Sequence, residues 1–216
     1  MKKALIGILL LSAGIWSCKK EAILSTVVNV SYPTITLKGN AVISTGIGTG
    51  SYVDPGATGY DDVKGTTTNL TPVSNNVDLT QAGFYNVTYT MKNSNGYTST
   101  VIRLVLVTPV SASLDWTGTY KRVSNGQHVT ITKKGTGLYT TDNIGGVAGN
   151  PSFLFPIYIG QTSDTTIAVP PQISPLGGNL FCTNGKFSLS AADTTFSYIV
   201  MGAGFGTAVR VFTHHP

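Results

Sequence analysis

Four aspartates in the first half of the chain are the residues whose type and spacing could bind a metal ion. Calcium in proteins takes six to eight oxygen ligands, many of them from closely spaced carboxylates. Three of the four lie in the stretch SYVDPGATGYDD, residues 51–62. A Pro-Gly pair interrupts their spacing and is typical of a turn. We therefore expect no metal ion; if calcium does bind, its ligands are Asp54, Asp61, Asp62 and Asp78.

Groups for catalysis are sparse in the second half of the chain. Its histidines are His128, His214 and His215. The last two are adjacent, so on an extended strand they point to opposite faces and cannot easily chelate one metal. Glycoside hydrolysis needs two carboxyl groups, and the chain has no glutamate after residue 21. We expect no enzymatic activity and no cofactor.

Aromatic side chains in the second half are candidates for binding a sugar. An aromatic ring can stack on the weakly apolar face of a pyranose, while polar neighbours fix the orientation of the sugar. The glycine-rich segment 143–155 is long, lacks alternation and ends in aromatic residues, as functional loops often do. Core packing is the alternative for each ring, because large aromatic residues are usually buried. The predicted ligand-binding residues are Trp116, Tyr139, Asp142, Asn143, Phe153, Phe155 and Tyr158.

The composition predicts that β-strands position these residues. Only 11% of the 216 residues are charged, and the formal net charge is +5. Threonine, serine, glycine and asparagine are frequent, which disfavours helices and favours strands and turns. The basic residues are scattered, which is not the pattern of a protein that binds nucleic acid.

Two β-domains are expected, 31–108 and 114–216, joined near Pro109. In the first, alternation predicts strands at 34–39, 84–92 and 97–107, which favours a small β-sandwich. Within 84–92 the face of Tyr85, Val87, Tyr89 and Met91 is expected in the core, and Asn95-Gly96 predicts a tight turn with positive φ at both positions. In the second, an antiparallel barrel or sandwich of about eight strands is expected. Its strands are predicted at 118–123, 127–134, 137–143, 152–160, 165–171, 186–191, 194–202 and 206–214.

The N-terminus has the pattern of a secretory signal. Lys2 and Lys3 precede an apolar run that is too short for a membrane-spanning helix. The following IWSC, residues 15–18, resembles the lipobox of bacterial lipoproteins. The resemblance implies a signal peptide at 1–17, acylation of Cys18 and a tether over 18–30. Several acyl chains would anchor the protein stably.

Residues 33–107 resemble the Ig-like domains of bacterial surface proteins. The matching stretches are YVDPGATGYDD at 52–62, DLTQAGFYNVTYT at 78–90 and the closing strand with Arg103. The lipobox, this domain and the second part, which opens DWTGTYKRV, together resemble small surface lipoproteins of Bacteroidetes. Several of those belong to glycan-utilisation loci. The resemblance supplies no catalytic motif.

These observations predict a non-catalytic, lipid-anchored protein of the outer membrane, exposed at the cell surface, that binds glycans as an accessory to polysaccharide uptake. The alternative is a structural or assembly protein of the envelope that acts through contacts with another protein. A third alternative is a barrel that carries a small apolar ligand, which requires an apolar cavity inside the second domain.

Overall fold

The computed structural model describes residues 30–148, 151–190, 193–202 and 204–216. Ser31–Pro216 forms one compact unit. The predicted signal peptide, Cys18 and nearly all of the tether lie outside the described residues. The described residues contain no helix with the length and apolarity needed to cross a membrane.

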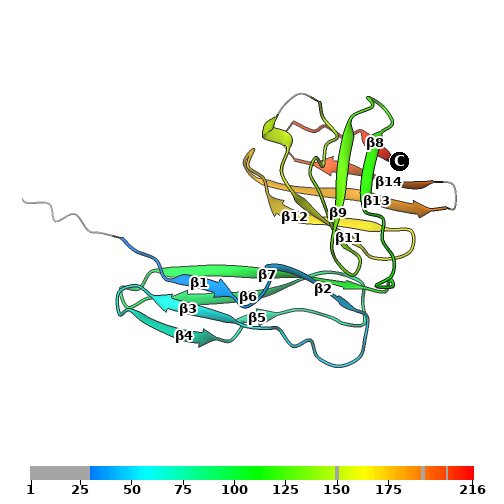
Figure 1. The fold of residues 1–216 in the computed structure, drawn as a ribbon. Coiled ribbons are helices and arrows are strands. Elements are labelled where there is room, and N and C mark those ends of the chain that lie inside the picture. Colours follow the sequence, from blue (N-terminus) through cyan, green and yellow to red (C-terminus); the bar gives the residue numbers. More distant parts are fainter. Residues whose placement is uncertain (1–29, 149–150, 191–192, 203) are drawn as a thin grey trace, which may run out of the picture. The chain divides into compact units, whose positions relative to one another are not determined.

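The first part consists of two sheets (Figure 1). One sheet has the order β1-β3-β4, and the other has the order β2-β7-β6-β5, with β2 parallel to β7. The expected β-sandwich is confirmed, because its core takes side chains from both sheets: Ala57 from β3, Val87 and Tyr89 from β6, and Val105 from β7. The strands are β1 Thr34–Leu37, β2 Val42–Gly46, β3 Ala57–Asp61, β4 Thr66–Leu70, β5 Ser74–Asn75, β6 Gly83–Lys92 and β7 Thr98–Thr108.

Alternation along β6 gives the face that was expected. Val87 and Tyr89 are fully buried, whereas Asn86 on the opposite face is exposed. The turn after β6 differs from the prediction. Only Gly96 has a positive φ, of 89°, and Asn93 instead accepts the backbone N–H groups of Asn95 and Tyr97 through its side chain. An asparagine side chain inside the loop therefore replaces the second positive-φ residue of a tight turn.

The second part is a closed barrel of eight antiparallel strands, in the order β10-β11-β12-β13-β14-β15-β8-β9. The predicted all-β class and the C-terminal barrel are confirmed. Closure pairs every strand on both sides, so the barrel leaves no free edge. The strands are β8 Gly118–Arg122, β9 His128–Gly135, β10 Leu138–Thr141, β11 Ile157–Gln161, β12 Ile167–Ile173, β13 Asn179–Leu189, β14 Thr194–Met201 and β15 Val209–His215.

One predicted strand is wrong over half of its length. The segment 152–160 was expected to be continuous, but Pro151–Phe153 forms a short 3-10 turn and β11 begins at Ile157. Pro156 separates the two, since proline lacks the N–H that a ladder hydrogen bond needs. The described residues between Thr141 and Ile157 therefore form a long connection, which places Ile144 and Phe155 in the barrel core.

Aromatic side chains fill the inside of the barrel. Trp116 lies at the centre of this packing, with Tyr139 at 4.2 Å, Phe187 at 5.1 Å and Phe196 at 5.6 Å between ring centroids. Phe196 in turn stacks on Phe212 at 4.7 Å. Such a packed interior does not favour the prediction of a barrel that carries an apolar ligand.

Candidate functional site

The aspartate of the Pro-Gly turn, Asp54, is held in a buried network. Arg103 Nε lies 2.9 Å from Asp54 Oδ2, and both side chains are almost fully buried. Tyr89 donates to Asp54 Oδ1 at 2.5 Å and Tyr52 to Oδ2 at 3.2 Å, while the Gly56 N–H donates at 2.8 Å. Burial, reinforced by the neighbouring carboxylate, raises the pKa of both tyrosines to about 12. Asp54 thus has its hydrogen-bonding capacity filled by the protein.

The guanidinium of Arg103 also joins segments of the chain. It donates to the carbonyl oxygens of Asn40, Lys38 and Gly56. A buried cation that has both a carboxylate and carbonyl partners is well compensated. Asp54 and Arg103 are therefore structural residues of the sandwich.

The other aspartates proposed for calcium are engaged elsewhere. Asp61 accepts hydrogen bonds from the hydroxyl of Ser94, at 2.6 Å, and from two backbone N–H groups of its own turn; these bonds hold its pKa below the usual value. Asp62 accepts from Asn93, and Asp78 accepts from the N–H and hydroxyl of Thr80. The four carboxylates do not converge. Over the whole described part of the chain, no three histidine, cysteine, aspartate or glutamate side chains gather to hold a metal ion.

Two histidines that are distant in sequence lie in contact. The rings of His128 and His215 are 4.8 Å apart, whereas His214 packs edge-on against Tyr120 at 5.3 Å. The adjacent pair His214 and His215 does point in different directions, as strand geometry requires. The contact with His128 was not predictable from the sequence, because it depends on the barrel closing through β8 between β15 and β9.

Three of the predicted sugar-binding aromatics, Trp116, Tyr139 and Phe155, lie in the core. Trp116 is 2% exposed and donates from Nε1 to Gln161 Oε1 at 3.0 Å. Tyr139 is fully buried and donates to the carbonyl of Leu114 at 3.0 Å, and burial raises its pKa to about 12. Other rings cover the faces of Trp116 and Tyr139, so neither of these two offers a stacking surface to solvent.

The remaining predicted residues lie in or beside the long connection. Asn143 is buried and closes a turn through two hydrogen bonds with the backbone of Val147. Phe153 packs edge-on against Phe205 at 5.4 Å. Tyr158 is half-buried on β11, and its backbone N–H donates to Gln172. None of these three lines the groove described next.

Asp142 and Phe155 come together in a groove on the outer wall of the barrel, which we call the loop groove. The groove has a volume of about 340 Å³. Hydroxyl-bearing side chains of β9 and β10 form its floor: Thr130, Thr132 and Thr140. Leu154, Phe155 and Pro156 of the long connection form an apolar wall.

Asp142 is the acidic residue of the loop groove. It is exposed, and its Oδ1 accepts the backbone N–H of Thr130 at 2.8 Å, which fixes the carboxylate beside the threonine floor. An apolar wall opposite hydroxyl groups and one acceptor is the arrangement that orients a small polar ligand. A single carboxylate does not supply the pair that glycoside hydrolysis needs.

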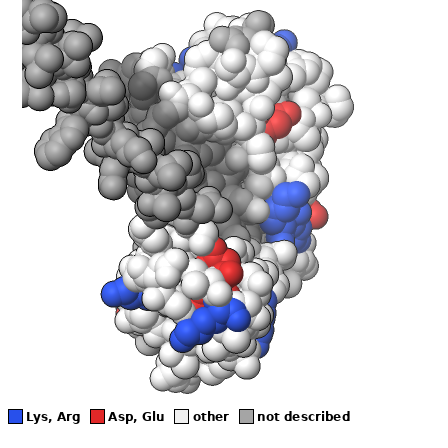
Figure 2. All heavy atoms as spheres, turned by 90° about the vertical axis from the view of Figure 1, so that its left-hand side faces the viewer, with Lys and Arg blue, Asp and Glu red and all other residues white. Residues whose placement is uncertain are grey.

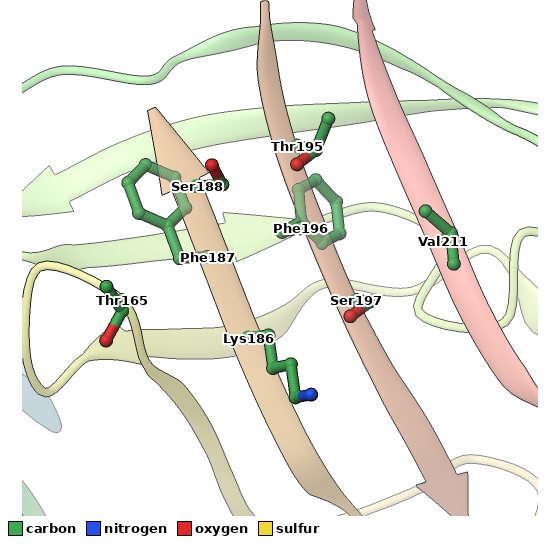
Figure 3. Close-up of a pocket in the computed structure, with 8 residues that line it drawn as sticks. All are labelled: Thr165, Lys186, Phe187, Ser188, Thr195, Phe196, Ser197 and Val211. Carbon is green, nitrogen blue, oxygen red and sulfur yellow. The ribbon is translucent and has the colours of Figure 1, made fainter. Parts of the chain in front are cut away.

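A second groove, which we call the strand groove, lies on the outer face of β13, β14 and β15 (Figure 3). Its volume is about 320 Å³. None of its residues was among the predicted ligand-binding residues. The available signal was the alternation KFSLS and TTFSY, in which polar residues alternate with the buried Phe187 and Phe196. Its polar lining residues are Thr165, Lys186, Ser188, Thr195 and Ser197.

The fold and these grooves define an all-β protein in which an Ig-like sandwich precedes an eight-stranded barrel. Residues 35–107 match the family model described as bacterial surface protein, Ig-like domain. The match spans β1 to β7 and includes both Asp54 and Arg103. The resemblance expected for the first part is confirmed: this part is similar to the Ig-like domains of bacterial surface proteins.

Two solved structures share similarity with the chain. A lipoprotein from Bacteroides thetaiotaomicron is 21% identical with a TM-score of 0.40, over 85% of this chain and 100% of that one. CBM51-2 in complex with GlcNAc and INT domains from Clostridium perfringens ZmpB is 14% identical with a TM-score of 0.30. That match covers 84% of this chain and 44% of the other. No curated protein matches the chain.

Proposed function

We propose that this protein is a non-catalytic lipoprotein of the outer-membrane surface that binds glycans in the loop groove. The observation that carries the proposal is the pairing of an apolar wall, Leu154 to Pro156, with a threonine floor and the fixed carboxylate of Asp142. A pyranose has one weakly apolar face and a rim of hydroxyl groups, so both sides of the groove have a partner on the sugar.

Lipid anchoring is the second part of the proposal. The support is the order of features at the N-terminus: two lysines, an apolar run, a small residue and Cys18. We expect Cys18→Ser to move the protein from the membrane fraction into the soluble fraction and to abolish labelling by a radioactive or clickable fatty acid. Labelling that persists in Cys18→Ser would contradict acylation at this residue.

Binding is tested with residues 24–216, which contain the whole compact unit. An array of neutral and acidic polysaccharides is probed with and without calcium, and bound ligands are then titrated by calorimetry. Failure to bind any neutral glycan would remove the loop groove as the site.

Two variants separate binding from folding. Asp142→Asn keeps an oxygen for the Thr130 N–H but loses the charge, and we expect affinity to fall about tenfold, as for hydrogen bonds to charged groups. Leu154→Ser removes part of the apolar wall at a side chain that is 55% exposed, so the fold should remain. The matched controls are Asp193→Asn and Ile173→Ser, at exposed positions outside the groove. If the controls weaken binding as much as the groove variants, the site is elsewhere.

One observation favours the alternative, an assembly role. β4 is the edge of its sheet, and Thr66 to Asn69 are exposed on both faces. The strand has no proline or charge, the usual devices that prevent pairing with another chain. A stable protein partner cross-linked to this strand in the intact envelope, together with no glycan binding, would favour this role.

A further inference from the structure

The strand groove is a regular grid of side chains across three strands. Lys186 on β13 pairs with Ser197 on β14, which pairs with Val211 on β15. Two residues further along β13, Ser188 pairs with Thr195 of β14. Because alternate residues of a strand point to the same face, these five side chains share the outer wall of the barrel. Figure 3 shows them on three neighbouring strands, with Thr165 on the side of β13 away from β14; all six residues line the strand groove.

The polar groups of this grid have no side-chain partner among the residues that the structure describes. Over the described residues, the ammonium of Lys186 and the hydroxyls of Ser188, Thr195 and Ser197 make no side-chain hydrogen bond and no ion pair. Elsewhere in the barrel, serine and threonine hydroxyls of turns are commonly paired, as Ser163 is with Thr166 at 2.6 Å. Four free polar groups in one hollow are therefore available to a ligand that carries several hydroxyls or acceptors.

The hollow extends beyond the grid in both directions. On one side it shares Lys186 and Ser197 with a hollow of about 410 Å³ that reaches Asn184 and Val209. On the other side it shares Thr165 and Ser188 with a hollow of about 360 Å³ that reaches Asp164. The exposed side chains of Val209 and Val211 provide an apolar border along β15. An extended ligand, longer than one sugar ring, fits such a series of hollows.

The charge of the strand groove is opposite to that of the loop groove. Lys186 is exposed at its centre, and the acidic side chain that lines its extension is Asp164, at one end. Charged residues make up only 11% of the chain, and on the face drawn in Figure 2 most of the atoms that are not grey are uncharged. An anionic group of a ligand would therefore meet Lys186 with little competition from protein carboxylates.

The two grooves lie on opposite walls of the barrel. In the closed strand order, β11 and β12 separate the β9–β10 pair from the β13–β14 pair on one side, and β15 and β8 separate them on the other. The loop groove is on the first pair, and the strand groove is on the second pair and extends to Val211 of β15. They share no residue, so ligands in the two grooves do not compete for the same groups.

We infer that the strand groove is a second glycan site and that it takes acidic polysaccharides, with a carboxylate or sulfate on Lys186 and sugar hydroxyls on the serine and threonine grid. A free anion would satisfy the lysine alone, whereas an acidic sugar chain satisfies the ammonium and the hydroxyls together. The inference deepens the proposed function, glycan binding, by adding a ligand class and a site.

The test measures binding of residues 24–216 to dextran sulfate and polygalacturonate, with dextran and inorganic polyphosphate as references. We expect Lys186→Gln to weaken binding of the acidic glycans about tenfold, since a charge-assisted hydrogen bond is lost. Lys186→Arg should retain binding, and Asp164→Asn should retain or strengthen it. Lys121→Gln is the control, because Lys121 is an exposed lysine on β8 outside both grooves.

Four results would overturn the inference. Neither acidic glycan binds; Lys186→Gln binds as the unaltered chain does; Lys121→Gln weakens binding equally, which indicates non-specific charge; or polyphosphate binds at Lys186 as tightly as dextran sulfate, which indicates a simple anion site. Asp142→Asn separates the two proposals. If Asp142→Asn weakens the binding of neutral glycans and acidic glycans do not bind at all, the loop groove is supported and the strand groove is rejected. If acidic glycans bind through Lys186 and neutral glycans do not bind, only the loop groove is rejected.

Discussion

Arg103 and Asp54 illustrate how single residues hold the sandwich. The guanidinium reaches one carboxylate and the carbonyl groups of three other residues, and its own side chain is fully buried. Removing one partner of a buried pair leaves the other charge without compensation, and this costs far more than the net contribution of the intact pair. The Pro-Gly turn is thus fixed from inside the domain.

We expect Arg103→Met to lower the free energy of unfolding by about 3 to 5 kcal/mol, measured by urea denaturation. The double variant Arg103→Met with Asp54→Leu should recover part of this loss, because it leaves no unpaired charge. Lys64→Met, at an exposed position, is the control. A loss below about 1 kcal/mol for Arg103→Met would show that the network does not stabilise the fold.

The sequence indicated the turn at Asp54 but not its partner. Pro-Gly spacing predicts a turn from local rules alone. The contact with Arg103 depends on how β7 packs against the turn, which no local pattern contains. The same limit explains the aromatic candidates: residue type made Trp116 and Phe155 equally suitable for stacking on a sugar. Only the closed barrel buries both rings in one core and leaves Phe155 also lining the loop groove.

At the scale of elements, β13 shows why one glycine is needed. Its pairing with β14 shifts register between Thr183 and Lys186, and Asn184 has a φ of 55°. A Cβ on Gly185 would lie 2.0 Å from the carbonyl oxygen of Ile167. The bulge brings β13 against the start of β12, and it sets the face on which Lys186 lies.

Gly185→Ala should therefore destabilise the protein by about 3 kcal/mol, as overpacking against backbone does. The displaced bulge should also weaken binding of dextran sulfate while neutral glycans still bind the loop groove. Gly46→Ala is the matched control, because a Cβ there meets no atom within 4 Å. Stability is measured by thermal unfolding and binding by calorimetry on both variants. Unchanged stability of Gly185→Ala would mean that the backbone of β12 shifts to accept the added Cβ at little cost.

Alternation predicted most strands of the barrel, but the bulge and the divided segment 152–160 were not predictable from it. A bulge inserts a residue that breaks the period of two, so β13 appeared in the sequence only as its regular end, 186–191, instead of Asn179–Leu189. The strand groove was not predicted either. Its side chains belong to different strands, and only the register of strand pairing places them in one grid.

For the molecule as a whole, buried tyrosines predict sensitivity to alkaline pH. The pKa of Tyr52, Tyr89 and Tyr139 is raised to about 12, mainly by burial, so the folded state favours the neutral phenol. Their contribution to stability is complete below the unfolded pKa of about 10 and is lost as the pH rises toward 12.

We expect the midpoint temperature of thermal unfolding to decrease as the pH is raised from about 10 to about 12. Absorbance at 295 nm should show part of the ten tyrosines ionising only as the protein unfolds. Ionisation of all tyrosines near pH 10 with the fold intact would contradict their burial. Tyr89→Phe should make the alkaline loss smaller, since one of the responsible phenols is gone.

The parallel pairing of β2 with β7 has a mechanical consequence. The chain enters the Ig-like domain at β1, continues into β2 and leaves the domain at the end of β7, and residues Val42 to Gly46 run alongside Leu104 to Thr108 in the same direction. A pull on the two ends of the domain therefore draws these strands past each other along their length. All the ladder hydrogen bonds of the pair share the load at once, instead of opening one at a time. The Ig-like domain is thus built to resist being stretched by force along its chain.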